Sequence, residues 1–135
     1  MRLRVSSGAG FGAPDFPRFI GVRRERRIQL VDVRSIDGLV ARGRRTLVSL
    51  RDGTSITAPD TLVSIERRLS PRIFLRVSRN AVVRLESVVQ LDPLSDGSLR
   101  LHLASGLQVR TSRHPERLLD ILRGWCYRPR AGESA

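Results

Sequence analysis

Residues 74–88 read FLRVSRNAVVRLESV, and the predicted fold is organised around this stretch. Two largely apolar runs, residues 74–77 and 81–85, flank a polar hinge at residues 78–80. Bulky and β-branched side chains on both sides of a polar break are typical of extended backbone. The pattern therefore predicts either two strands joined by a turn or one strand with a sharp break.

The hinge places Arg79 beside Asn80 on a turn that we expect to be exposed. Arginine can donate to both acceptors on the edge of guanine, and asparagine can pair with adenine through two hydrogen bonds. The two side chains are therefore candidates for reading bases. A purely structural turn is the alternative, because asparagine is a common turn residue and arginine is the most frequent charged residue here.

The composition favours one folded domain with a polyanionic partner. A chain of 135 residues with 40% hydrophobic residues can build one modest core. The 25 basic residues, all of them arginine, outnumber the 13 acidic residues and give a formal net charge of +12. This balance indicates nucleic acid as the first candidate partner and anionic lipid as the second.

The single cysteine and the lack of long apolar segments argue against a disulfide-linked protein and against a membrane protein. Cys126 cannot form an intrachain disulfide or a cysteine-based metal site, and we expect a packed thiol between Trp125 and Tyr127. The sequence has no signal-peptide core and no stretch of membrane-spanning length. A cytoplasmic location is the expectation.

The two ends of the chain differ in composition from its centre. Residues 1–22 are predicted to form a flexible leader, residues 23–124 the domain and residues 125–135 a C-terminal tail. A basic cluster opens the domain, and its members are Arg23, Arg24, Arg26 and Arg27. This cluster is either a solvated arm or a contact to the DNA backbone.

Short extended segments with tight turns dominate the predicted domain. Besides the two runs around the hinge, the candidate strands are residues 28–33, 35–40, 46–50, 55–57, 87–91, 99–103 and 107–111. Asp52-Gly53 is a strong hairpin signal, and Asp96-Gly97 gives another turn. Leucines alternate with polar residues in 99–103, so His102 is predicted to point outward and not to act as a catalyst or ligand.

Two short helices complete the prediction. The first can be capped by Asp60 or Thr61 and ends before Pro71. The second has Pro115 in its first turn and ends near Gly124. Their apolar stripes are Leu62, Ile65 and Leu69, and Leu118, Leu119, Ile121 and Leu122. The predicted fold class is mostly β, an α+β arrangement of short antiparallel strands with one short helix and a C-terminal helix.

Arg113 lies where the last predicted strand meets the second helix. The helix dipole prefers anions at a helix N-terminus, so an arginine adds no stability there. The same position suits a contact to a phosphate or a base.

The order of these motifs resembles the LytTR family of bacterial DNA-binding domains. That family carries a phenylalanine, a hydrophobic residue, arginine and valine, then typically His-Arg-Ser, before an apolar strand, and residues 74–80 match this arrangement. The family's later Ser-Arg before the final helix matches Ser112 and Arg113. The resemblance covers about residues 28–122 and implies a compact, mostly β fold. It also implies that loops, and not a recognition helix, enter the major groove.

The resemblance further implies which residues contact DNA. The implied base readers are Arg79, Arg113 and one arginine of the loop at residues 42–45, with Arg45 favoured before Arg44. Asn80, Arg76, Arg42 and Arg44 are expected to position the backbone or support the loops. For Arg76 the alternative is an ion pair with an internal acid.

The chain also departs from the family pattern. Ser78 and Asn80 replace the usual histidine and serine, and arginine replaces the usual aromatic residue near Gly43. We expect no receiver domain before the DNA-binding part. These differences bear on base preference and on the input signal more than on the fold.

The leading hypothesis is a stand-alone transcriptional regulator that binds duplex DNA sequence-specifically, with two copies on paired direct repeats. A small RNA-binding β module is an alternative, although an aromatic content of 4% argues against base stacking. A regulatory protein-interaction domain is another, and a protein partner such as a membrane-bound inhibitor fits either case. No nucleophile motif, metal-ligand spacing or phosphate loop indicates an enzyme, a cofactor or a small-molecule substrate.

Overall fold

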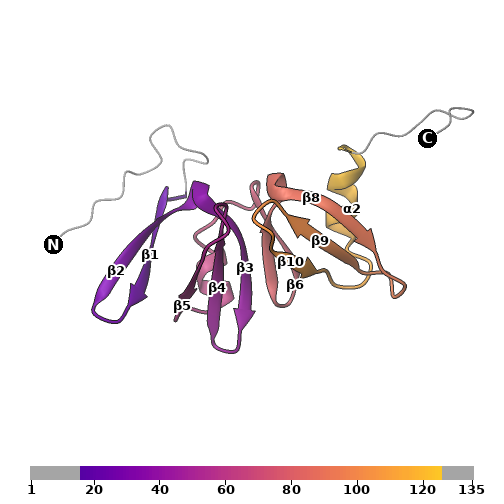
Figure 1. The fold of residues 1–135 in the computed structure, drawn as a ribbon. Helices are drawn as coiled ribbons and strands as arrows, with labels where there is room; N and C mark the ends of the chain where they lie inside the picture. The colour runs from indigo at the N-terminus through magenta and orange to yellow at the C-terminus, as the bar shows by residue number, and fades with distance from the viewer. Residues whose placement is uncertain (1–15, 126–135) are drawn as a thin grey trace, which may run out of the picture.

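A computed structural model describes residues 16–125 of the chain, and these residues form three antiparallel sheets and two short α-helices (Figure 1). The first sheet pairs β1 (Phe19–Arg24) with β2 (Arg27–Asp32). The second has the order β5 (Ser55–Ala58), β4 (Arg45–Leu50), β3 (Ile36–Arg42), β7 (Ala81–Arg84) and β6 (Phe74–Ser78). The third has the order β10 (Gln108–Arg110), β9 (Leu99–Leu103) and β8 (Val88–Pro93).

The helices and turns connect these sheets. The helices are α1 (Leu62–Glu66) and α2 (Glu116–Arg123), and two single 3₁₀ turns are η1 (Val33–Ser35) and η2 (Leu85–Ser87). The predicted mostly β fold class with little helix is confirmed, and the hinge is a turn between two strands. No helix among residues 16–125 is both long enough and apolar enough to cross a membrane.

The five-stranded sheet separates two hydrophobic cores. Side chains alternate between the two faces of a strand, and in β7 the buried Val82 enters one core while the buried Val83 enters the other. The first core lies toward the β1–β2 sheet and α1, and the second lies toward the β8–β10 sheet and α2. In Figure 1 the five-stranded sheet accordingly stands between the other two. The β3–β4 and β6–β7 turns, two of the three predicted DNA-binding loops, extend from this sheet.

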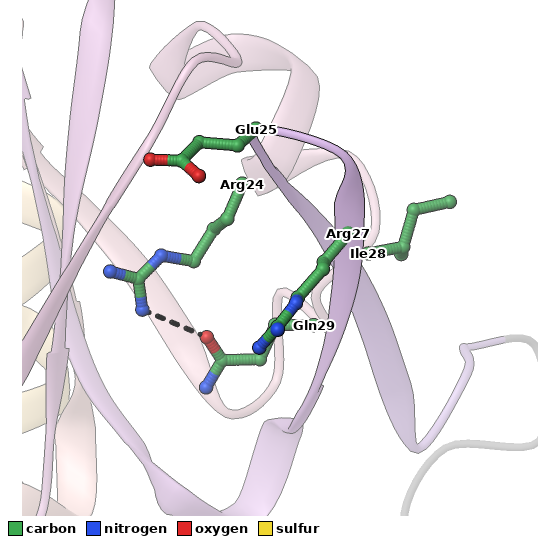
Figure 2. A pocket seen from close by; sticks show the side chains of 5 residues that line it. All are labelled: Arg24, Glu25, Arg27, Ile28 and Gln29. Atoms are coloured by element: carbon green, nitrogen blue, oxygen red, sulfur yellow. Dashed lines mark hydrogen bonds between the residues drawn. The ribbon is translucent and has the colours of Figure 1, made fainter.

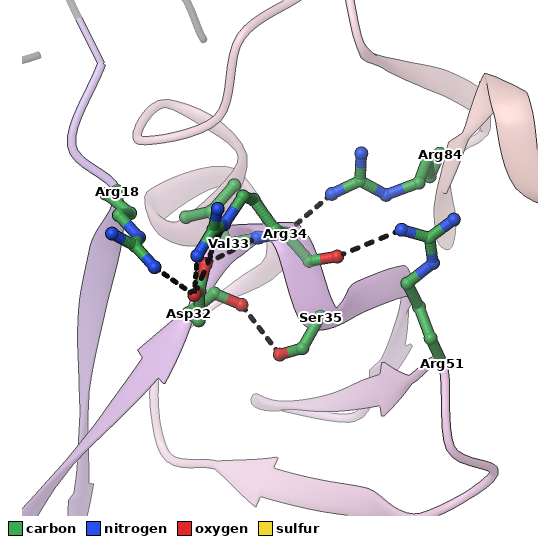
Figure 3. Close-up of polar contacts among 7 residues, drawn as sticks. All are labelled: Arg18, Asp32, Val33, Arg34, Ser35, Arg51 and Arg84. Atoms are coloured by element: carbon green, nitrogen blue, oxygen red, sulfur yellow. Dashed lines mark hydrogen bonds and ion pairs between the residues drawn. The ribbon is translucent and has the colours of Figure 1, made fainter. Parts of the chain in front are cut away.

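A buried arginine ties the first sheet to the second. Arg84, at the end of β7, is 6% exposed, and its guanidinium stacks 4.7 Å from the centroid of the Phe74 ring. Its Nη2 donates to the carbonyl of Val33 at 2.6 Å, and its Nε donates to the carbonyl of Ile36 at 2.8 Å. Arg51 donates to the carbonyl of Arg34 in the same turn at 3.4 Å (Figure 3). Burial, with Arg51 close by, lowers the pKa of Arg84. Arg84 therefore anchors η1, the turn that connects β2 of the first sheet to β3 of the second.

The structure corrects the sequence-based boundaries at two places. Residues 19–22 are not part of a leader, because they pair with β2 and bury Ile20 and Val22 in the first core. The first helix ends at Glu66, well before Pro71, although Leu69 is still buried as predicted. The first 15 residues of the predicted leader, Cys126 and nearly all of the predicted tail lie outside the described residues.

Replacing Arg84 should destabilise the domain strongly. Arg84→Met keeps much of the packing on Phe74 but leaves the buried carbonyls of Val33 and Ile36 without their guanidinium donors. We expect a loss of about 2–4 kcal/mol in the free energy of unfolding, measured by urea denaturation. Arg72→Met, at an exposed position before β6, should change it by less than about 0.5 kcal/mol. Equal values for the two variants would contradict the anchoring role of Arg84.

Candidate nucleic-acid interface

The hinge between β6 and β7 presents two exposed polar side chains. Arg79 and Asn80 form the turn, and the amide of Asn80 donates to Oγ of Ser78 at 3.1 Å. The strand pairing shifts register between Arg76 and Ser78, which indicates a bulge beside the turn. The turn is therefore rigid at its backbone, while the side chains of Arg79 and Asn80 face solvent.

Two backbone hydrogen bonds bring the predicted loops to this hinge. The amide of Ala41, near the end of β3, donates to the carbonyl of Asn80 at 2.7 Å. The amide of Ser112, in the loop after β10, donates to the carbonyl of Val77 at 2.8 Å. The β3–β4 turn thus lies on one side of the hinge and the loop that carries Arg113 on the other. The structure places all three predicted loops at one edge of the molecule, the lower edge in Figure 1.

The β3–β4 turn carries three exposed arginines. Arg42 and Arg45 are directly opposite each other in the strand register, and Gly43 and Arg44 form the turn between them. Gly43 has a φ of 62°, a conformation that glycine adopts without strain. Like charges placed opposite each other are destabilising. Among residues 16–125 no carboxylate lies within 4.0 Å of these three guanidinium groups.

Arg76 connects the hinge to α1. Its guanidinium forms an ion pair with Glu66 of α1 at 3.0 Å, and its Nη1 donates to the carbonyl of Arg79 at 3.2 Å. The side chain thus connects α1 to the backbone of the hinge. Arg76 forms the ion pair with an internal acid that was expected as the alternative to a DNA contact. The same contacts suit a role in positioning the hinge.

Asp96 organises the loop that carries Arg113. This carboxylate accepts hydrogen bonds from the amide and the hydroxyl of Ser98 and from Arg110, and the Nε of Arg113 lies 3.7 Å from it. The hydrogen bonds from Ser98, followed by those from Arg110, hold the pKa of Asp96 well below its usual value. The β8–β9 turn and the start of α2 are thereby joined through one acidic side chain.

A close contact between Gly97 and His114 fixes the same loop. The amide of His114 donates to the carbonyl of Gly97 at 3.0 Å, and His114 itself has a φ of 50°. A Cβ on Gly97 would lie 2.7 Å from Cε1 of the His114 ring. The backbone next to Arg113 is therefore held in a conformation that L-residues rarely adopt.

His102 lies away from this edge. Its Nε2 is 2.6 Å from Oδ2 of Asp92 on the neighbouring strand, and its side chain is 24% exposed. Hydrogen bonds from Gln90 and then from His102 lower the pKa of Asp92. The side chain points outward as predicted but is part of a cross-strand pair. Among residues 16–125 no three His, Cys, Asp or Glu side chains are grouped so that they could hold a metal ion.

Comparison with known proteins agrees with this geometry. The family model described as the LytTr DNA-binding domain matches residues 26–121. The chain belongs to the LytTR family. This family consists of DNA-binding domains, so DNA is a partner of this chain. None of the curated proteins matches the chain.

A solved structure shows the same fold. It is the LytTr DNA-binding domain of a protein from Bacillus cereus, described as a methyl-accepting/DNA response regulator. The two structures superpose with a TM-score of 0.66 at 19% sequence identity, over 79% of this chain and 97% of that one. The LytTR fold is thus retained although most residues differ.

Sequence reasoning missed the residues that hold the loops in place. Asp96 lies in a predicted turn, and the sequence gives no signal for Glu66, but the two are the acids that hold the loop of Arg113 and Arg76, respectively. The Asp-Gly pair at 96–97 was the available signal, because a carboxylate at that turn position is well placed to accept nearby amides.

A methyl group at Gly97 should disturb the Arg113 loop. Gly97→Ala and Gly106→Ala both force alanine into a left-handed conformation, with φ of +88° and +97°, so each should cost about 1 kcal/mol of stability. Only the Cβ at Gly97 meets the His114 ring, since nothing lies within 4 Å of a Cβ at Gly106. NMR should therefore show shifted His114 ring signals in Gly97→Ala alone. Identical His114 spectra in the two variants would contradict the contact.

The role of Asp96 should appear in the pH dependence of stability. Its folded pKa lies below its unfolded value near 3.8, so its stabilising effect is present above that value and is lost as pH falls toward the folded pKa. Asp96→Asn should unfold at lower urea concentration than the wild type at neutral pH. The difference between them should shrink as the pH falls below about 3.8. A constant difference at all pH values would contradict this assignment.

Proposed function

We propose that the chain is a transcriptional regulator that binds duplex DNA sequence-specifically through the major groove. Arg79, Arg113 and Arg45 are the proposed base readers. The observation that carries the proposal is the pair of hydrogen bonds from Ala41 and Ser112, which hold three arginine-bearing loops side by side. Guanidinium groups held at a fixed spacing can each donate two hydrogen bonds to one base edge. Such bidentate contacts discriminate between bases.

The width of this edge supports contact with a short DNA segment. Strands in a sheet lie roughly 4.8 Å apart, and from β4 through β3, β7 and β6 to the Ser112 loop there are about four such spacings. The loops therefore span roughly 20 Å, which corresponds to about six base pairs at roughly 3.4 Å each. One copy covers about half a helical turn on one side of the duplex. A second copy on the same side lies about one turn away, which sets the spacing expected for paired sites. The two sites are proposed to be direct repeats.

The charge arrangement supports a polyanion at this edge. Arg42 and Arg45 repel each other in the free chain, and a phosphate backbone would relieve this repulsion. Arg42 and Arg44 are proposed to contact phosphates, because they flank the turn next to Arg45. Arg76 is proposed to position the hinge, since its side chain donates to the carbonyl of Arg79. Asn80 is proposed to support the same turn, where its backbone amide donates to Oγ of Ser78 and its carbonyl accepts from the amide of Ala41.

Selection of bound duplexes from a random pool, at near-physiological salt, tests base readout. We expect the wild type to enrich a direct-repeat motif. Arg79→Ala and Arg113→Ala should each lower affinity for that motif by roughly 5- to 150-fold, the equivalent of 1–3 kcal/mol per base contact, and should relax preference at separate positions. Arg72→Ala is the matched control, because Arg72 lies just before β6, at the opposite end of that strand from the hinge. This variant should keep both the motif and the affinity of the wild type.

Salt-dependent binding without any motif, unchanged by either substitution, would refute base readout by these loops. Equal or tighter binding of single-stranded or duplex RNA at the same salt would instead favour an RNA-binding module.

A further inference from the structure

The β1–β2 hairpin ends in a second group of arginines. Arg23, Arg24, Arg26 and Arg27 are all exposed, and Glu25 is the only acid among them. Arg24 and Arg27 are directly opposite each other in the register, as Arg42 and Arg45 are in the β3–β4 turn. The structure thus repeats, in a second hairpin, an arrangement that destabilises the free chain.

The end of this hairpin projects from the domain while its base is fixed. Ile20, Val22 and Val31 are buried in the first core, whereas every residue from 23 to 30 is exposed, including Ile28 at 58%. In Figure 1 the hairpin turn points toward the same lower edge as the β3–β4 turn. The hairpin therefore extends the arginine-bearing edge beyond Arg45.

Its turn is built at a conformational cost. Arg24 and Arg27 close a two-residue turn of Glu25 and Arg26, and Glu25 has a φ of 54°. Glycine, asparagine and aspartate are the residues that suit such a turn. A glutamate in this conformation points to a use for the turn other than chain reversal.

The hairpin and Arg45 share a cleft. A hollow of about 360 Å³ is lined by Arg23, Arg24 and Glu25 from the hairpin and by Arg45, Thr57 and Pro59 from the second sheet. A second hollow of about 550 Å³ lies on the hairpin itself, and it is lined by Arg24, Glu25, Arg27, Ile28 and Gln29. Figure 2 shows both guanidinium groups directed into this hollow with the Gln29 amide between them, and Arg24 donates to Oε1 of Gln29 at 3.0 Å. The two guanidinium groups outnumber the single carboxylate of Glu25 in this hollow, and guanidinium groups form strong, often bidentate hydrogen bonds to phosphate.

We propose that the β1–β2 hairpin binds phosphates of the DNA backbone next to the bases read by the loops. Arg24 and Arg27 hold one phosphate, and Arg23 holds a neighbouring one beside Arg45. Because the hairpin adjoins Arg45 and not Arg113, the contact lies on one flank of each recognition site. The hairpin adds affinity and fixes position without reading sequence. This inference rests on the proposed DNA-binding edge.

The test compares two double variants of the full chain. Arg24→Gln/Arg27→Gln removes the opposed pair and relieves its repulsion, so thermal unfolding should show a stability equal to or above that of the wild type. Arg72→Gln/Arg123→Gln removes the same charge at positions that precede β6 and end α2, away from the loops. Affinity for the selected duplex and for an unrelated duplex is measured across a series of salt concentrations.

The hairpin variant should lower the slope of log affinity against log salt by about 1 unit, because Arg24 and Arg27 hold one phosphate and each lost phosphate contact lowers the slope by about 0.9. Affinity should fall by the same factor for both duplexes, and the selected motif should stay unchanged. The control variant should change the slope by less than about 0.5 units. On wild-type protein, phosphate ethylation should interfere with binding on one flank of each recognition site.

An unchanged slope in the hairpin variant, or an equal change in the control, would overturn the proposal, as would the absence of interference from the flanking phosphates. Failure of base readout is recognised separately. In that case selection gives no motif, while a slope lowered only in the hairpin variant still supports the phosphate contact.

Discussion

The hydrogen bond from the amide of Ala41 to the carbonyl of Asn80 is the constraint on which the DNA-binding edge depends. It extends the pairing of β3 with β7 into the hinge, and so fixes the β3–β4 turn against the β6–β7 turn. The bond from Ser112 to Val77 does the same on the other side. Both are backbone interactions, so side chains at the edge can vary while the spacing of the loops stays the same. This explains how a domain 19% identical to a solved LytTR structure retains its fold.

Arginine has two separate roles in this chain. Arg84 and Arg76 are held by carbonyls or by a carboxylate, and they fix the framework. The arginines at the hairpin turns have no carboxylate partner among residues 16–125, and they raise the positive potential at the edge. The planar guanidinium serves both roles, because it can donate several hydrogen bonds in one plane and stays charged when buried. Net charge alone would not have separated the framework arginines from those that face a ligand.

The sequence predicted the elements that carry a clear period. Alternating leucines identified β9, and an apolar stripe identified α2. It did not predict β1, because only Ile20 and Val22 mark the inward face of a strand that ends in arginines. It identified Arg79 and Arg113 as candidates through local motifs. Their proximity could not be predicted, since it follows from hydrogen bonds between residues more than thirty positions apart. The burial of Arg84 could not be predicted either, because arginine side chains are mostly exposed in folded proteins.

The two cores on opposite faces of the five-stranded sheet also determine how the domain unfolds. β7 supplies Val82 to the first core and Val83 to the second. Leu39 of β3, which is paired with Val82, is buried in the first core. Neither core can open without breaking the strands that the other core needs. We therefore expect the domain to melt in a single cooperative transition, although its strands are divided among three sheets. Damage to the core beneath α2, far from the β1–β2 hairpin, would release that hairpin as well.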